Sequence, residues 1–168
     1  MVDEALLREL DRYIKRHYIE DKFLAEGQLS RSVDFDKLQL ELQERLNENR
    51  QSLAEYIQEW IKKKGMSESD VRNGSMLSRN IFSKIRNNRE YHPEKRTVFA
   101  IALALHLSYD EAREFMSFMG YTFSNMLKED IIVGFCFERN KYDITDVNEM
   151  LNRNGFNVLG SGLNQKEL

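Results

Sequence analysis

A short basic segment carries the clearest potential for chemistry in this sequence. Residues 78–93, SRNIFSKIRNNREYHP, contain four Lys or Arg side chains and one acidic side chain, Glu90. The basic residues are Arg79, Lys84, Arg86 and Arg89. Guanidinium and ammonium groups bind phosphate oxygens strongly, and arginine can form two hydrogen bonds with one base edge. The segment therefore predicts a surface that binds a polyanion.

Positive charge is concentrated in this part of the chain. The 168 residues include 25 Lys and Arg against 28 Asp and Glu, a net charge of −3. Residues 72–96 hold 7 basic and 2 acidic side chains, so this segment carries +5 and the remainder −8. A cationic face on an acidic protein can hold a polyanion in one orientation. The alternative is that the arginines form weak surface ion pairs with acidic side chains of neighbouring helices.

Other kinds of site are not indicated. The histidines, His17, His92 and His106, are far apart in sequence, and the single cysteine, Cys136, lies in an apolar stretch. We therefore expect no metal site and an inert, buried thiol. Since no glycine-rich phosphate loop or nucleophile motif occurs, we also expect a non-enzymatic protein without a cofactor.

Composition indicates an all-α protein. The chain has one proline and eight glycines, and its long uninterrupted runs are rich in Leu, Ile, Lys, Glu and Arg. No run approaches 18 apolar residues, so we expect no membrane-spanning helix. The charged N-terminus and the lone cysteine favour a cytoplasmic protein.

Apolar spacing predicts two helices in the first part of the chain, one over residues 3–20 and one after a loop at residues 25–37. Their apolar positions are Leu6, Leu7, Leu10, Tyr13, Ile14 and Tyr18, then Phe35, Leu38, Leu42 and Leu46. A break is expected at residues 47–51. This N-terminal extension, residues 1–51, is the expected site of homodimerisation or of a protein partner.

Helix-start signals divide the rest of the chain. Ser residues followed three positions later by Glu or Asp are typical of capped helix starts, and they occur at Ser52, Ser67 and Ser108. Further helices are expected after Ser78, Ser124 and Asp143, and Pro93 is expected in the first turn of the apolar helix EKRTVFAIALALHL. Gly65 and Gly120 should end helices. The first of these helices should bury Leu53, Tyr56, Ile57, Trp60 and Ile61. We therefore expect a compact helical domain over residues 52–160 and a polar tail over residues 161–168.

The order of these signals over residues 53–119 resembles the lambda-repressor-like, Xre/Cro-type helix-turn-helix domain of bacterial regulators. The matching features are Ser83-Lys84-Ile85, Asn87-Asn88-Arg89, Pro93, the apolar helix from Val98 to Leu107, and the helix start from Ser108 to Ala112. The resemblance implies a DNA-binding transcription regulator that binds duplex DNA, with half-sites occupied by a dimer.

The resemblance also implies which residues contact DNA. Arg79, Asn80, Ser83 and Lys84 would face DNA from the recognition helix, and Asn87, Asn88 and Arg89 would reach phosphates. Ile81, Phe82 and Ile85 would point into the core. Two positions depart from the family pattern. Glu68 replaces a glutamine that contacts the DNA backbone, and Met76 lies at or near the usual glycine of the turn.

A second resemblance favours an alternative function. Residues 82–160, which end in NVLG, are similar to a module found at the end of otherwise unrelated bacterial proteins. The helices after Gly120 belong to this longer module. It implies an adaptor that keeps the repressor-like fold for protein contacts without binding DNA.

Overall fold

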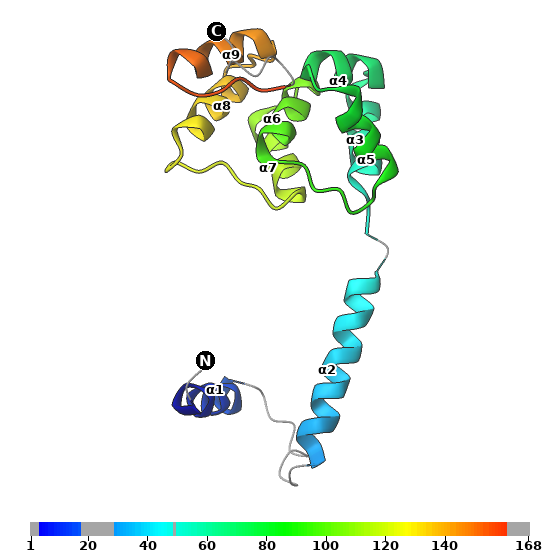
Figure 1. Cartoon of the computed structure of the whole chain (residues 1–168), viewed down its shortest axis with the longest axis vertical. Helices are drawn as coiled ribbons and strands as arrows, with labels where there is room; N and C mark the ends of the chain where they lie inside the picture. The colour runs from blue at the N-terminus through cyan, green and yellow to red at the C-terminus, as the bar shows by residue number, and fades with distance from the viewer. Residues whose placement is uncertain (1–3, 18–28, 49, 161–168) are drawn as a thin grey trace. The chain divides into compact units, whose positions relative to one another are not determined.

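The computed structural model of the chain describes the backbone of residues 4–17, 29–48 and 50–160, and the side chains of residues 4–14, 34–48 and 50–160. Within these ranges there are nine α-helices and no strand, so the predicted all-α fold class is confirmed (Figure 1). The helices are α1 (Glu4–His17), α2 (Leu29–Asn47), α3 (Leu53–Lys64), α4 (Glu68–Ser75), α5 (Arg79–Asn87), α6 (Lys95–Ala104), α7 (Tyr109–Phe118), α8 (Lys128–Glu138) and α9 (Ile144–Arg153). The chain divides into two units, Met1–Arg50 and Gln51–Leu168.

The first unit contributes α1 and α2. Helix α1 occupies most of the range predicted from its leucine spacing, while the predicted apolar position Tyr18 lies outside the described residues. Helix α2 begins at Leu29, so the loop predicted at residues 25–37 is wrong from residue 29 onward. The described side chains of α2 are all exposed. An exposed turn of a helix does not have to carry regularly spaced apolar residues, so the sequence pattern need not reveal that the turn is helical.

Three helices of the second unit begin with the predicted caps. The Ser52 hydroxyl accepts a hydrogen bond from the Glu55 amide at 3.2 Å, and the Ser52 amide donates to the Glu55 carboxylate at 2.7 Å. Ser67 with Asp70 and Ser108 with Glu111 repeat this reciprocal arrangement at the starts of α4 and α7. Each cap satisfies amides at a helix start that have no partner within the helix.

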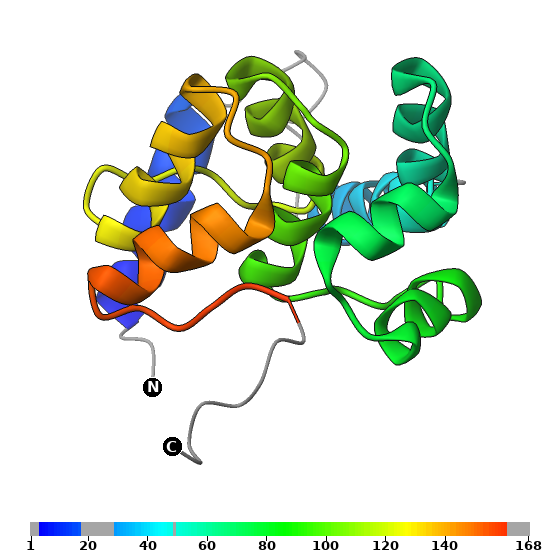
Figure 2. The same cartoon turned by 90° about the horizontal axis from the view of Figure 1, so that it is seen from above.

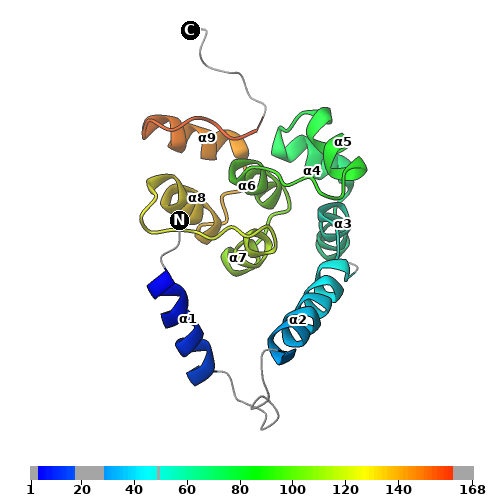
Figure 3. The same ribbon diagram turned by 60° about the horizontal axis from the view of Figure 1, so that its bottom comes forward.

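The core of the second unit is built around α6. All residues from Val98 to Leu105 are buried, and α6 contacts α4, α7 and α9. Figure 3 shows α6 between the α3–α5 helices on one side and α8 and α9 on the other. The five side chains predicted to be buried on α3 are buried, and Tyr56 among them stacks on Phe115 and Phe118 of α7.

Two helix starts differ from the predictions. Pro93 precedes the N-cap residue Glu94, so it lies outside α6, where its carbonyl accepts a hydrogen bond from Tyr121. Helix α8 begins at Lys128 and not after Ser124. The Ser124 amide donates to the carboxylate of Asp130 at 2.8 Å. Asp130 is buried and paired with Lys95, so this contact holds residues 124–127 in a turn.

The residues that follow α9 form what we call the C-terminal strap, residues 156–160. Figure 2 shows the strap running from α9 toward α4. Asn148 of α9 fixes it with two hydrogen bonds to the backbone of Leu159, at 3.1 and 2.6 Å. Its last residue, Gly160, lies so close to α4 that an added Cβ would meet the carbonyl oxygen of Ser75 at 2.8 Å. The helices after α7 are therefore tied to the end of α4.

Candidate nucleic-acid interface

A three-residue turn joins α4 to α5. Met76, its first residue, adopts the left-handed conformation (φ 51°, ψ 23°) that glycine adopts most readily. Leu77 is buried, and the hydroxyl of Ser78 caps α5 by accepting a hydrogen bond from the Ile81 amide. A methionine thus takes the backbone conformation for which the resemblance leads us to expect a glycine.

Helix α5 has a buried face and an exposed face. Phe82 and Ile85 are buried and Ile81 is half-buried, in agreement with the core positions that the resemblance implies. Positions 79, 80, 83, 84 and 87 share the other face because they follow the helical repeat. All seven residues predicted to bind DNA are exposed: Arg79, Asn80, Ser83, Lys84 and Asn87 on α5, and Asn88 and Arg89 directly after it.

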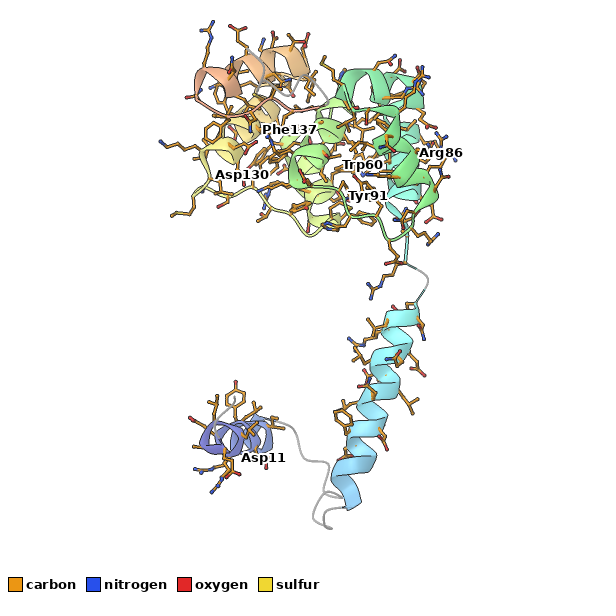
Figure 4. The ribbon with its side chains drawn as sticks, in the orientation of Figure 1. Asp11, Trp60, Arg86, Tyr91, Asp130 and Phe137 are labelled. Carbon is orange, nitrogen blue, oxygen red and sulfur yellow. The ribbon has the colours of Figure 1, made fainter. Side chains whose placement is uncertain are left out.

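Two of the arginines pair with carboxylates of neighbouring helices. Arg86 forms an ion pair with Glu68 at the start of α4, and Arg89 lies 3.2 Å from Glu55 of α3. Figure 4 shows Arg86 on the outer side of the helical unit. Hydrogen bonding from the Ser52 amide, and then from Arg89, lowers the pKa of Glu55. Because the four side chains are 42–64% exposed, water and salt screen both pairs, and each contributes little to the stability of the fold.

Sequence reasoning gave ion pairs with neighbouring helices as the alternative to a polyanion-binding surface, but it did not name their partners. It gave Glu55 only a capping role and Glu68 only the place of a glutamine of the family. Arg86 is 18 residues from Glu68, and Arg89 is 34 residues from Glu55. A single sequence carries no signal for contacts at such separations.

Arg79 and Lys84 differ from the other two basic residues. Among the residues that the structure describes, neither has a carboxylate within ion-pair distance, and Lys84 Nζ lies 5.9 Å from the ring centroid of Tyr91. On the same face, the Asn87 amide donates a hydrogen bond to the Ser83 hydroxyl at 3.1 Å. The exposed face of α5 therefore keeps positive charge that no described carboxylate neutralises, at Arg79 in its first turn and at Lys84 in its last turn.

A shallow groove runs beside α5, with a volume of about 360 Å³. Its apolar lining comes from Ala54, Ile57, Phe82 and Ile85, and its polar lining from Glu55, Gln58, Glu68 and Arg86. The Glu68–Arg86 pair and the hydrogen bond from Gln58 to Glu68 thus lie at its polar edge. The residues that line the groove therefore come from α3, α4 and α5.

Groups that could support other chemistry have structural roles in the described parts of the chain. His92 contacts the Met119 carbonyl oxygen at 2.8 Å, and His106 stacks on Tyr142. Cys136 is buried, and burial raises the pKa of its thiol. No group of three or more His, Cys, Asp or Glu side chains that could hold a metal ion occurs among the described residues. The expected absence of a metal site, cofactor or enzymatic activity stays a prediction.

Comparison with known proteins gives no information about this interface. No protein-family model, curated protein or solved structure matches this chain. Within the described residues, no helix is long and apolar enough to cross a membrane.

Proposed function

We propose that this chain is a non-enzymatic DNA-binding transcription regulator that places α5 in the major groove of duplex DNA. One observation carries the proposal. The exposed face of α5 presents Arg79 and Lys84 without a described carboxylate partner, beside the amide of Asn80 and the hydroxyl of Ser83. These are the side-chain types that bind base edges and phosphates.

The dimensions and chemistry of α5 suit this role. Nine residues make a helix about 13 Å long, and the major groove is about 12 Å wide. Arg79 can donate two hydrogen bonds to guanine, and Asn80 can pair with adenine through its amide. Lys84, Asn87 and Asn88 supply donors for phosphate oxygens. Arg89 can bind a phosphate only if it breaks its ion pair with Glu55.

The ion pairs limit the strength of this binding. Residues 72–96 carry +5. Carboxylates from outside this segment pair with four of its basic side chains and reduce the local charge to +1: Glu55, Glu68, Glu129 and Asp130. A surface of this charge releases few counterions, so we expect modest affinity that falls with added salt.

Binding of the full chain to duplex DNA at two salt concentrations tests the proposal. We expect retention at low salt and weaker binding at higher salt. Arg79→Ala should weaken binding at least about fivefold, since a bidentate contact with a base is worth roughly 1–3 kcal/mol. Lys84→Ala should also weaken binding and make it less dependent on salt, because it removes a phosphate contact. Arg153→Ala is the matched control, because Arg153 is an exposed arginine of α9. An unretained wild-type chain, or equal losses for Arg79→Ala and Arg153→Ala, would overturn the proposal.

A second candidate function is a protein-interaction adaptor, which an apolar stripe on α8 favours. Leu127, Ile131 and Phe135 follow each other at four-residue spacing and are about half exposed, and the neighbouring Met126 is 90% exposed. Exposed apolar patches of this kind are typical of protein-binding surfaces. The α8 helix is apolar around its whole circumference, because Val133, Cys136 and Phe137 are buried on its other side.

Capture from a nuclease-treated lysate separates the two functions. An adaptor keeps its protein partner after nuclease treatment and loses it on Ile131→Asp, while Arg79→Ala has no effect. A DNA-binding regulator shows the reverse pattern, with recovery that depends on nucleic acid and on Arg79.

A further inference from the structure

The first unit presents an apolar stripe on each of its two described helices. The stripe of α1 consists of Leu6, Leu7, Leu10, Tyr13 and Ile14, and that of α2 consists of Phe35, Leu38, Leu42 and Leu46. Each of these side chains is 46–66% exposed. No side chain described in residues 4–14 and 34–48 is buried, so these helices have no core of their own in the described part of the unit.

Helices of this length need a contact that covers their apolar side. The 14 residues of α1 span about 21 Å, close to the length below which an isolated helix is only marginally stable in water. In proteins, most of the stability of such a helix comes from packing its apolar face. The stripes therefore indicate that α1 and α2 bury these faces against another surface.

The spacing within the stripes is that of helices that pair along their length. Leu7, Leu10 and Ile14 are separated by steps of three and four residues, and Phe35, Leu38 and Leu42 repeat these steps. This is the pattern of the a and d positions in coiled coils and helix bundles. Leu40 is also exposed but projects from the opposite side of α2, so it marks a face outside the stripe.

Charge and area fit a second copy of the chain. Helix α1 carries 4 basic and 3 acidic side chains, a net of +1, and α2 carries 3 basic and 4 acidic side chains, a net of −1. Two copies therefore bring together helices of opposite and nearly balanced charge, so no strong repulsion opposes pairing. Stripes of this size can bury roughly 800 Å² on each partner, the area of a standard specific interface.

We propose that α1 and α2 pair with the same helices of a second copy to form a dimeric helical bundle. The bundle covers the apolar stripes of both copies and leaves Leu40 exposed. This association does not depend on DNA binding by α5, although a dimer would present two copies of that helix.

Sedimentation equilibrium of the full chain, without DNA and over a range of concentrations, tests this proposal. A dimer has a mass of 39.8 kDa, twice the 19.9 kDa of one chain. We expect this mass for the wild type and for Leu40→Lys, and 19.9 kDa for Leu38→Lys combined with Leu42→Lys. The single tryptophan, Trp60, is buried in α3, so its fluorescence reports whether the second unit of each variant stays folded.

Three outcomes would overturn the proposal. The first is a wild-type mass of 19.9 kDa at every concentration, which would mean that the stripes do not join two copies. The second is a dimer mass for the stripe variant, in which Leu38→Lys and Leu42→Lys are combined. The third is a Leu40→Lys control that dissociates as completely as the stripe variant does. None of these outcomes bears on whether α5 binds DNA.

Discussion

At the scale of single residues, the basic side chains of the 78–93 segment fall into two groups. Arg86 and Arg89 are held by carboxylates of α4 and α3, while Arg79 and Lys84 have no such partner in the described chain. A phosphate that approaches Arg86 must compete with Glu68 for the same guanidinium. Glu68 therefore lowers the affinity of the proposed interface in two ways, by occupying Arg86 and by repelling phosphate.

Replacing Glu68 with glutamine tests this effect. In the Glu68→Gln variant Arg86 is released, so we expect duplex DNA affinity to rise by up to about fivefold, equivalent to roughly 1 kcal/mol. The free energy of unfolding should change by less than about 1 kcal/mol, because the lost ion pair is exposed. Fluorescence anisotropy with a labelled duplex measures the affinity.

Glu149→Gln is the matched control, because Glu149 forms an exposed ion pair with Arg153 on α9. This control should leave DNA affinity unchanged. Equal affinities for the two variants would contradict the role we assign to Glu68.

At the scale of elements, the C-terminal strap links the last helices to the α4–α5 turn. Asn148 and Arg96 fix the strap through its backbone, and Gly160 ends it against Ser75 and Met76. The left-handed conformation of Met76 is unfavourable by itself, so the contact with Gly160 supports the turn that sets the position of α5. We infer that the strap is part of what holds α5 in place.

A pair of glycine substitutions measures this contact. Gly155 and Gly160 both have positive φ, 81° and 79°, so alanine strains the backbone at either site. Only at Gly160 would the new Cβ also meet backbone and side-chain atoms within 3.1 Å. We expect Gly155→Ala to lower the free energy of unfolding by about 1 kcal/mol and Gly160→Ala by at least about 2 kcal/mol.

Urea unfolding followed through Trp60 fluorescence gives both free energies. If the two variants are equally destabilised, the strap does not press on the turn. Loss of DNA binding by Gly160→Ala in the folded state would show in addition that the strap positions α5.

The features of these elements that the sequence could predict depend on residues close together in the chain. The caps at Ser52, Ser67 and Ser108 involve partners three residues away, so the sequence alone predicts them. For α5, the resemblance implies that Phe82 and Ile85 point into the core, and both are buried. In contrast, the ion pairs of Arg86 and Arg89 and the contact of Gly160 with α4 join distant segments, and only the folded chain brings these partners together.

At the scale of the whole molecule, the two units differ in how they are stabilised. The second unit has a continuous core around α6, whereas the described part of the first unit has exposed apolar stripes and no buried side chain. Charge is also unevenly distributed, since one 25-residue segment carries +5 and the remainder carries −8. This distribution would attract a polyanion to one surface and repel it elsewhere, which would favour one binding orientation.

The capping carboxylates make the stability of the second unit depend on pH. Hydrogen bonds from Ser52 and Ser67 lower the pKa values of Glu55 and Asp70. Burial raises the pKa of Glu111, but hydrogen bonds from Lys64 and the Ser108 amide outweigh it, so that this pKa is also lowered. A carboxyl group with a lowered folded-state pKa stabilises the fold above its unfolded pKa, and this contribution is lost as the pH falls through the folded value.

We therefore expect this contribution to be complete at neutral pH, and the free energy of unfolding to decrease as the pH falls below the ordinary glutamate pKa of 4.5. Glu111→Gln should make this decrease smaller, because glutamine keeps the cap without titrating. Urea unfolding at several pH values measures the slope for both proteins. An unchanged slope in Glu111→Gln would exclude Glu111 as a source of the pH dependence.

The burial of Cys136 has a practical consequence for spectroscopy. It is the only cysteine in the sequence, and its raised thiol pKa and lack of exposure make it a poor target for maleimide reagents in the folded state. A cysteine introduced at an exposed position such as Ser83 would then react selectively. The native chain is thus already suited to attaching a single fluorophore or spin label to α5.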